Sequence, residues 1–205
     1  MPADIHPAFF AAVPPIAFRD PLAELLGAAA PGAVIEYTFA EVVKAAGHVC
    51  PTVAGAWLVT RAALAALYPD TVPVRGEIAV ACMGAPAQFG YGPMAQVIAN
   101  LTGAAPETGF RGLAGRYARA GLLTFRPETP ALATFVFRRT DTGAAVRVAY
   151  QPESILPDPG TRAAMAGALA GDEASARELR RLWLDRVERI LAAADAVVHV
   201  DAEAA

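Results

Sequence analysis

The stretch ALATFVFRRTDTGAAVRVAY, residues 131–150, decides the fold class. Two runs rich in β-branched and aromatic residues, 131–138 and 144–150, flank the tetrapeptide Thr-Asp-Thr-Gly at 140–143. Runs of this composition on either side of a turn predict a β-hairpin. A further strand is expected at 74–82, where the uncharged run from Ile78 to Ala81 indicates burial on both faces.

Helical patterns surround these strands. Thr38-Phe39-Ala40-Glu41 fits a capping box, which predicts a helix that ends at Gly47. Thr52 is expected to cap the next helix. The remaining helices are expected at 22–30, 53–68, 93–101 and, after a linker at 157–160, up to about residue 195.

These elements predict an α+β fold, with a mixed β-sheet, packed helices and additional C-terminal helices. Residues 1–36 are expected to form an N-terminal arm with one short helix. Residues 37–156 are expected to form the α+β domain. The helices of 161–196 carry an apolar stripe at helical spacing and are expected to pack on the same domain.

Composition and charge exclude several classes of protein. The chain has 205 residues, of which 49 are Ala, and its formal charge is −3 with no basic stripe, so we expect no nucleic-acid partner. The uncharged run 78–106 is long enough to span a membrane, but its many Gly and Pro residues argue against a lipid-exposed helix. The first residues lack the pattern of a secretory signal, which predicts a cytoplasmic protein. A homodimer is the expected oligomer.

The residues that carry chemistry are His48, Cys50 and Cys82. His48 and Cys50 stand two residues apart on a short connection before a helix, where the helix dipole favours a thiolate. Cys82 ends the predicted strand beside a Gly- and Pro-containing loop. One imidazole and two thiolates form a three-ligand set for a transition metal, with zinc as the expected ion, and leave one coordination position open.

Other interpretations of these three residues stay open. A buried cysteine often only packs, and a histidine before a helix often only forms hydrogen bonds. Cys50 is also suited to act as a nucleophile that His48 activates, or to form a redox-sensitive disulfide with Cys82. A metal at this site would suit a metal-dependent enzyme.

Gln88 and Tyr91 follow Cys82 on the loop and are candidate cofactor-binding residues or a fourth ligand. The alternative is that they pack or cap the next helix. The expected partner is a metal ion or a small-molecule ligand, and a haem-like ligand is among those to look for.

The segment Gly47-His48-Val49-Cys50-Pro51 resembles the GHxCP signature of the FmdE family, which is named after a component of formylmethanofuran dehydrogenase. A strand ending in Cys82 before Gly84 and the hairpin at 139–148 resemble the same family. The resemblance covers residues 39–150.

The resemblance implies a fold like the C-terminal, catalytic domain of glyceraldehyde-3-phosphate dehydrogenase. It also implies that His48, Cys50 and Cys82 converge on one metal site that holds or delivers its ligand. The chain departs from the family pattern in three ways. Thr52 stands where the family has Gly, residues 85–90 lack the usual Gly-Lys-Gly, and the C-terminal zinc ribbon of longer members is missing.

Overall fold

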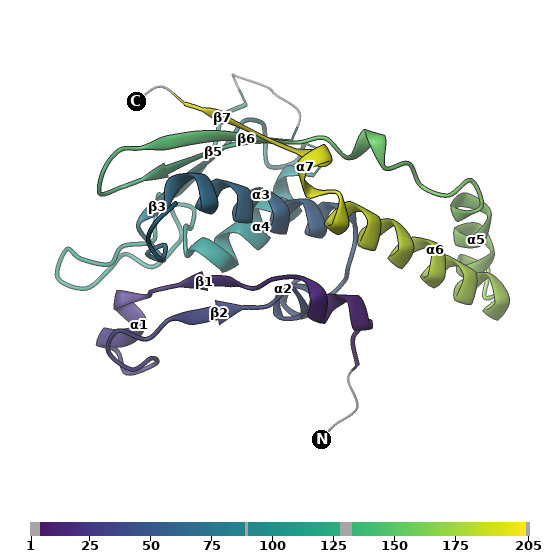
Figure 1. Ribbon diagram of the computed structural model, residues 1–205, viewed down its shortest axis with the longest axis horizontal. Coiled ribbons are helices and arrows are strands. Elements are labelled where there is room, and N and C mark those ends of the chain that lie inside the picture. Colours follow the sequence, from purple (N-terminus) through teal and green to yellow (C-terminus); the bar gives the residue numbers. More distant parts are fainter. Residues whose placement is uncertain (1–4, 89, 128–132, 204–205) are drawn as a thin grey trace.

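The computed structural model describes residues 5–88, 90–127 and 133–203 and shows an α+β fold in three layers. A five-stranded sheet forms one layer, helices α3 and α4 form the next, and an N-terminal hairpin with α2 forms the third (Figure 1). The predicted α+β fold class with a mixed sheet is therefore confirmed.

The five-stranded sheet has the strand order β4-β3-β5-β6-β7. β3 pairs in parallel with β4, and every other neighbouring pair is antiparallel. The strands of this sheet are β3 (Ile78–Cys82), β4 (Leu123–Phe125), β5 (Thr134–Arg139), β6 (Ala145–Tyr150) and β7 (Val198–Ala202). The hairpin predicted at 131–150 is confirmed as β5–β6, with positions 131 and 132 outside the described residues.

Strand β3 differs from its prediction in length and in burial. It covers only residues 78–82, and buried side chains alternate with half-buried ones along it. The expectation of burial on both faces was wrong, because α3 and α4 cover only one face of this sheet (Figure 1). Ala79 and Ala81 point to the other face, which explains why small residues suffice there.

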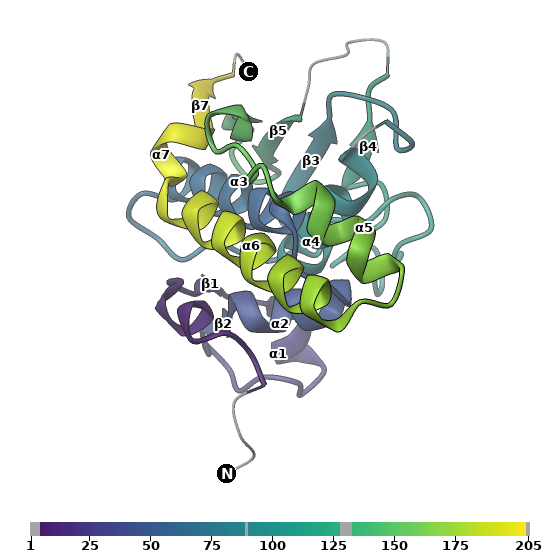
Figure 2. The same cartoon turned by 90° about the vertical axis from the view of Figure 1, so that its right-hand side faces the viewer.

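Helix α3 (Pro51–Leu67) is the central helix of the molecule. It lies between the sheet and the N-terminal layer, and side chains all around it are buried (Figures 1 and 2). Trp57 and Val59 are fully buried, and the Trp57 ring meets the edge of Phe39 from α2. An apolar helix without a polar face is the composition expected of a helix buried on several sides.

Local signals account for several of the other helix ends. The Thr38–Glu41 capping box is present at the start of α2 (Phe39–Ala46), and Gly47 ends that helix with a φ of 74°. Asp20 caps α1 (Pro21–Leu25), which is shorter than predicted, and α4 (Tyr91–Thr102) ends before Gly103. The N-terminal layer also contains the 3₁₀ helix η1 (Ala8–Ala12) and strands β1 (Ile16–Phe18) and β2 (Ile35–Tyr37).

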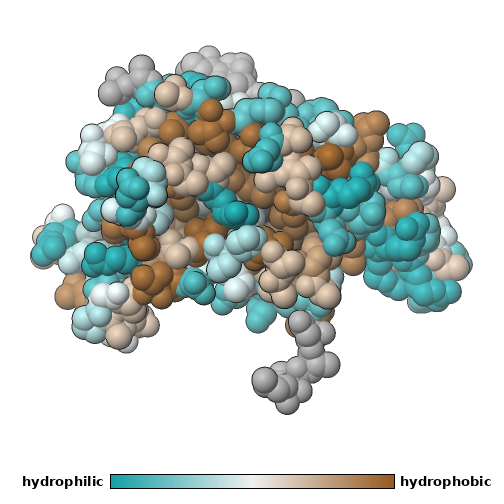
Figure 3. All heavy atoms as spheres, in the orientation of Figure 1, coloured by the Kyte–Doolittle hydropathy of each residue, from teal (hydrophilic) through white to brown (hydrophobic). Residues whose placement is uncertain are grey.

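After η2 (Pro152–Ser154), the C-terminal part forms a helical hairpin and then returns to the sheet. α5 (Thr161–Leu169) packs along α6 (Glu173–Ala192), and α7 (Ala194–Val197) leads into β7 (Figure 2). The projecting α5–α6 end is mainly hydrophilic on the face shown in Figure 3. Among the described residues, no helix has the length and apolar character needed to cross a membrane.

Candidate functional site

The N-terminus of α3 positions Cys50. Cys50 is the residue that caps this helix, and its sulfur accepts a hydrogen bond from the Val53 backbone N–H at 3.4 Å. We expected Thr52 to be the cap, which was wrong by two residues. Pro51 explains the difference, because proline is favoured at the first helical position, where its missing N–H is not needed. The helix N-terminus therefore points its partial positive charge at the Cys50 sulfur.

His48 lies against Cys50. Its Nε2 atom is 3.3 Å from the Cys50 sulfur, and its Nδ1 atom is 3.1 Å from the Ala46 carbonyl oxygen. A carbonyl oxygen only accepts hydrogen bonds, so this contact places the proton of a neutral imidazole on Nδ1. Nε2 then presents its lone pair to the Cys50 thiol. The geometry is that of a thiol, a base and a group that orients the base.

Two distant aromatic side chains hold the connection that carries this pair. The Trp183 indole N–H donates to the Val49 carbonyl at 2.7 Å, and the Tyr150 hydroxyl donates to the Pro51 carbonyl at 2.8 Å. Trp183 comes from α6 and Tyr150 from the end of β6. The backbone on both sides of Cys50 is thus fixed by the C-terminal helix and by the sheet.

A cavity of about 440 Å³ opens beside Cys50. Its wall is mainly apolar and aromatic, with Met94, Tyr150 and Trp183 contributing large side chains. Glu153 and Arg186 are the charged side chains among its described lining residues. A cavity of this size and character suits a small, mainly apolar molecule with a few polar groups.

Close packing shapes the wall formed by Tyr150. A Cβ atom added at Gly55, on the first turns of α3, would lie 2.3 Å from the Tyr150 ring. Gly55 therefore lets the ring lie directly on the helix. The same burial raises the pKa of the Tyr150 phenol, so this hydroxyl stays protonated and keeps its hydrogen bond to Pro51.

Cys82 lies at the end of β3 and is fully buried. Burial raises the pKa of its thiol to about 12, so the neutral form dominates at neutral pH. Within the described ranges, Cys82 is not among the residues that line the cavity at Cys50, and no three His, Cys, Asp or Glu side chains are grouped to hold a metal ion. The structure therefore brings His48 and Cys50 together and leaves Cys82 apart.

Tyr91 and Gln88 have local contacts. The buried Tyr91 hydroxyl donates to the Met83 carbonyl and accepts from the Thr134 backbone N–H, both at 2.9 Å. The exposed Gln88 side chain accepts from the Ala85 N–H within its own turn. These contacts match the alternative interpretation, in which both residues support the loop. Their role in binding a cofactor stays a prediction.

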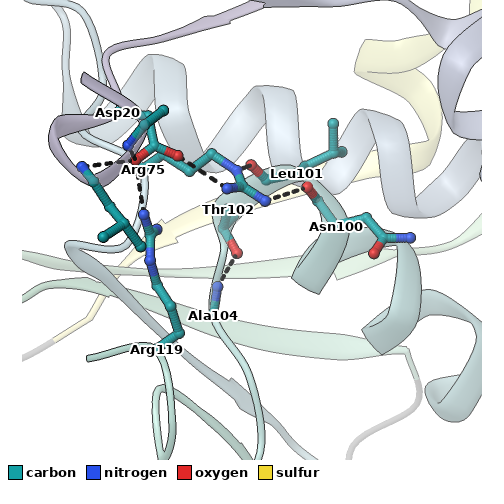
Figure 4. A network of polar contacts seen from close by, with 9 residues as sticks. Asp20, Arg75, Asn100, Leu101, Thr102, Ala104 and Arg119 are labelled. Carbon is teal, nitrogen blue, oxygen red and sulfur yellow. Dashed lines mark hydrogen bonds and ion pairs between the residues drawn. The ribbon is translucent and has the colours of Figure 1, made fainter. Parts of the chain in front are cut away.

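A second polar cluster lies far from Cys50 and is structural (Figure 4). Asp20 is buried, and its carboxylate pairs with Arg75 at 3.0 Å and with Arg119 at 2.9 Å. Arg75 also donates to the carbonyls of Leu101 and Asn100 at the end of α4. This cluster ties the N-terminal layer to the core. Sequence patterns did not indicate it, because its members are 55 and 99 residues apart.

Comparisons with known proteins add little to this geometry. No protein-family model and no curated protein matches the chain. Among solved structures, a similar chain is a tungsten formylmethanofuran dehydrogenase (FmdE)-like protein from Syntrophus aciditrophicus. It is 13% identical, with a TM-score of 0.45, and the match covers 82% of this chain and 73% of that one. A likeness at this level assigns neither a family nor a function.

Proposed function

We propose that the protein acts on a small molecule through Cys50 as the nucleophile and His48 as its general base. The observation that carries this proposal is the 3.3 Å contact between the Cys50 sulfur and His48 Nε2, with Nδ1 oriented by Ala46. The adjacent 440 Å³ cavity provides room for the substrate. A suitable reacting group is the acyl carbon of an ester or thioester, which a thiolate attacks readily.

The proposed reaction has two steps. In the first step, His48 Nε2 takes the Cys50 proton while the sulfur attacks the acyl carbon. The bond to the leaving group breaks, and the leaving group departs with the proton from His48. In the second step, water attacks the acyl-cysteine and gives its proton to His48. The C–S bond then breaks, the acid product leaves and Cys50 regains its proton.

The helix N-terminus supports both steps. The Val53 N–H already donates to the sulfur, and the positive end of the α3 dipole stabilises negative charge on it. The hydrogen bonds from Trp183 and Tyr150 hold the backbone around Cys50, so that little reorganisation is needed when the sulfur reacts.

An acylation experiment tests this proposal. The protein is incubated with p-nitrophenyl acetate, release of p-nitrophenolate is followed by absorbance, and acetylated peptides are mapped by mass spectrometry. We expect acetylation at Cys50, about tenfold slower or more in His48→Ala. Cys82→Ser is the matched control and keeps the wild-type rate. Absence of acetyl-Cys50, or acetylation that is independent of His48, would overturn the proposal.

A metal site is the second candidate function, in which His48, Cys50 and Cys82 hold or deliver a transition metal such as zinc. The contact that favours it is the one between Nδ1 and Ala46, because metal-binding histidines commonly donate their second N–H to a carbonyl. The three side chains do not fit a metal as they stand, since Cys82 is buried, protonated and apart from the pair. This function therefore requires Cys82 to move and lose its proton.

Elemental analysis of the protein purified without added metal tests the second candidate, and an absorption spectrum of the same sample reveals a coloured or haem-like ligand. Near one equivalent of metal, lost in Cys50→Ser and in Cys82→Ser, supports it. Less than about 0.1 equivalent, unchanged in both variants, contradicts it.

A further inference from the structure

Arg186 lies on α6 and lines the cavity beside Cys50. Its Nε donates to the Ile155 carbonyl at 2.9 Å, which fixes the direction of the guanidinium group. Throughout the described ranges, its two terminal nitrogens have no hydrogen-bond or ion-pair partner. A half-buried guanidinium with its terminal nitrogens unpaired at a cavity wall is a site prepared for an anion.

The Tyr150 hydroxyl relates Arg186 to the reactive sulfur. Burial raises the pKa of this phenol, the positive charge of Arg186 opposes the rise, and the Cys50 thiol adds to it. Both Arg186 and Cys50 therefore lie close enough to the same hydroxyl to act on it electrostatically. One small molecule in the cavity is thus able to meet the sulfur at one end and the guanidinium at the other.

We propose that Arg186 binds the carboxylate of the molecule that reacts with Cys50, so that the substrates are small monoanionic acyl compounds. This inference rests on the function proposed above and names its substrate class. A guanidinium binds a carboxylate through paired N–H donors, and it keeps its charge at any physiological pH. The apolar wall of Met94 and Trp183 accommodates the part of the substrate between the two ends.

Glu153 acts in the opposite direction. It also lines the cavity, and its carboxylate repels an anionic substrate. Glu153 is exposed to solvent, whereas Arg186 is half-buried, so water and salt screen the repulsion more than the attraction. The charge balance of the cavity therefore favours an anion that contacts Arg186 directly.

Two matched alkylating reagents test this inference. Iodoacetate and iodoacetamide both react when a thiolate attacks the CH₂ carbon, forms a C–S bond and releases iodide, but only iodoacetate carries a carboxylate. The rate of modification of Cys50 by each reagent is measured by peptide mass spectrometry. The iodoacetate-to-iodoacetamide ratio is then compared with that of glutathione in the same buffer. This ratio cancels differences in the intrinsic reactivity and accessibility of the thiol.

We expect the ratio at Cys50 to exceed that of glutathione by about fivefold or more, the effect of one partly buried charge pair. Arg186→Met removes most of this excess, Arg186→Lys retains part of it, and Glu153→Gln increases it. Arg189→Met, one turn further along α6 in an exposed ion pair, is the matched control and leaves the ratio unchanged.

The possible failures are distinguishable. Rapid, His48-dependent alkylation of Cys50 with the same ratio in wild type and Arg186→Met overturns the role of Arg186 and leaves the Cys50–His48 pair intact. Alkylation of Cys50 that is no faster in wild type than in His48→Ala, with both reagents, overturns the proposed function and this inference with it.

Discussion

The Nε2 atom of His48 lies 3.3 Å from the sulfur of Cys50, and the Nδ1 atom of the same ring is held by the Ala46 carbonyl. This relationship joins the end of α2 to the start of α3. Gly47 makes it possible, because its φ of 74° turns the chain out of α2 and lets the two side chains meet. The local backbone therefore creates the pair, and distant residues hold it in place.

The buried cluster around Asp20 predicts a large stability effect. Arg119→Met leaves the Asp20 carboxylate with one ion-pair partner fewer, and Asp20 and Arg119 are both at least nine-tenths buried. Removing one partner of a buried pair costs about 3–5 kcal/mol of unfolding free energy. Urea unfolding measures this change. Arg189→Met is the control, and it changes stability by less than about 0.5 kcal/mol because its pair with Asp185 is exposed.

The same cluster predicts a pH dependence. Burial works to raise the pKa of Asp20, but the Ala23 N–H and the charges of Arg75 and Arg119 outweigh it and hold this pKa below its usual range. A carboxyl with a lowered pKa in the folded state stabilises the protein above its unfolded pKa, near 4, and loses that contribution as the pH falls. Unfolding free energy should therefore drop between about pH 5 and pH 2, and less steeply in Asp20→Asn. Equal slopes in both proteins would contradict this role.

Gly55 predicts a substitution that opposes helix propensity. Alanine is intrinsically favoured over glycine within a helix by up to about 1 kcal/mol. An added Cβ would nevertheless lie 2.3 Å from the Tyr150 ring, so the ring has to move. We expect Gly55→Ala to lower the unfolding free energy by about 1–3 kcal/mol. A stabilised Gly55→Ala protein would show that the Tyr150 ring is not packed on α3.

The corrected helix cap yields a direct comparison. Cys50 accepts the Val53 N–H, so Thr52 is not needed as a cap, and Thr52→Ala should change the unfolding free energy by less than about 0.5 kcal/mol. Thr38→Ala removes the capping box of α2 and should cost about 1 kcal/mol. Chemical denaturation of the two variants side by side measures both values. A larger loss in Thr52→Ala than in Thr38→Ala would reverse the assignment.

How much of the fold was predictable depended on the range of the signals. The α2 capping box and the β5–β6 hairpin were predicted because the residues that specify them are neighbours in the sequence. Strand β7 was missed, because its segment forms a strand only by pairing with β6, about 50 residues earlier. The break at Gly171 between α5 and α6 was also missed, because the prediction followed one continuous apolar stripe.

The candidate site shows the same division. The proximity of His48 and Cys50 was predictable from their spacing of two residues. The roles of Tyr150, Trp183 and Arg186 were not, because these residues reach the cavity from β6 and α6. The convergence of Cys82 with the pair was expected from a resemblance, and the structure leaves this thiol within the apolar face of the sheet.

The central claim is that His48 activates Cys50, and the alkylation rate of Cys50 by iodoacetamide at neutral pH tests it most directly. Peptide mapping separates Cys50 from Cys82, whose burial makes it an internal slow reference. The account predicts that Cys50 reacts faster than Cys82 and that His48→Ala slows Cys50 by about tenfold or more while leaving Cys82 unchanged. Equal rates at Cys50 in wild type and His48→Ala would contradict it.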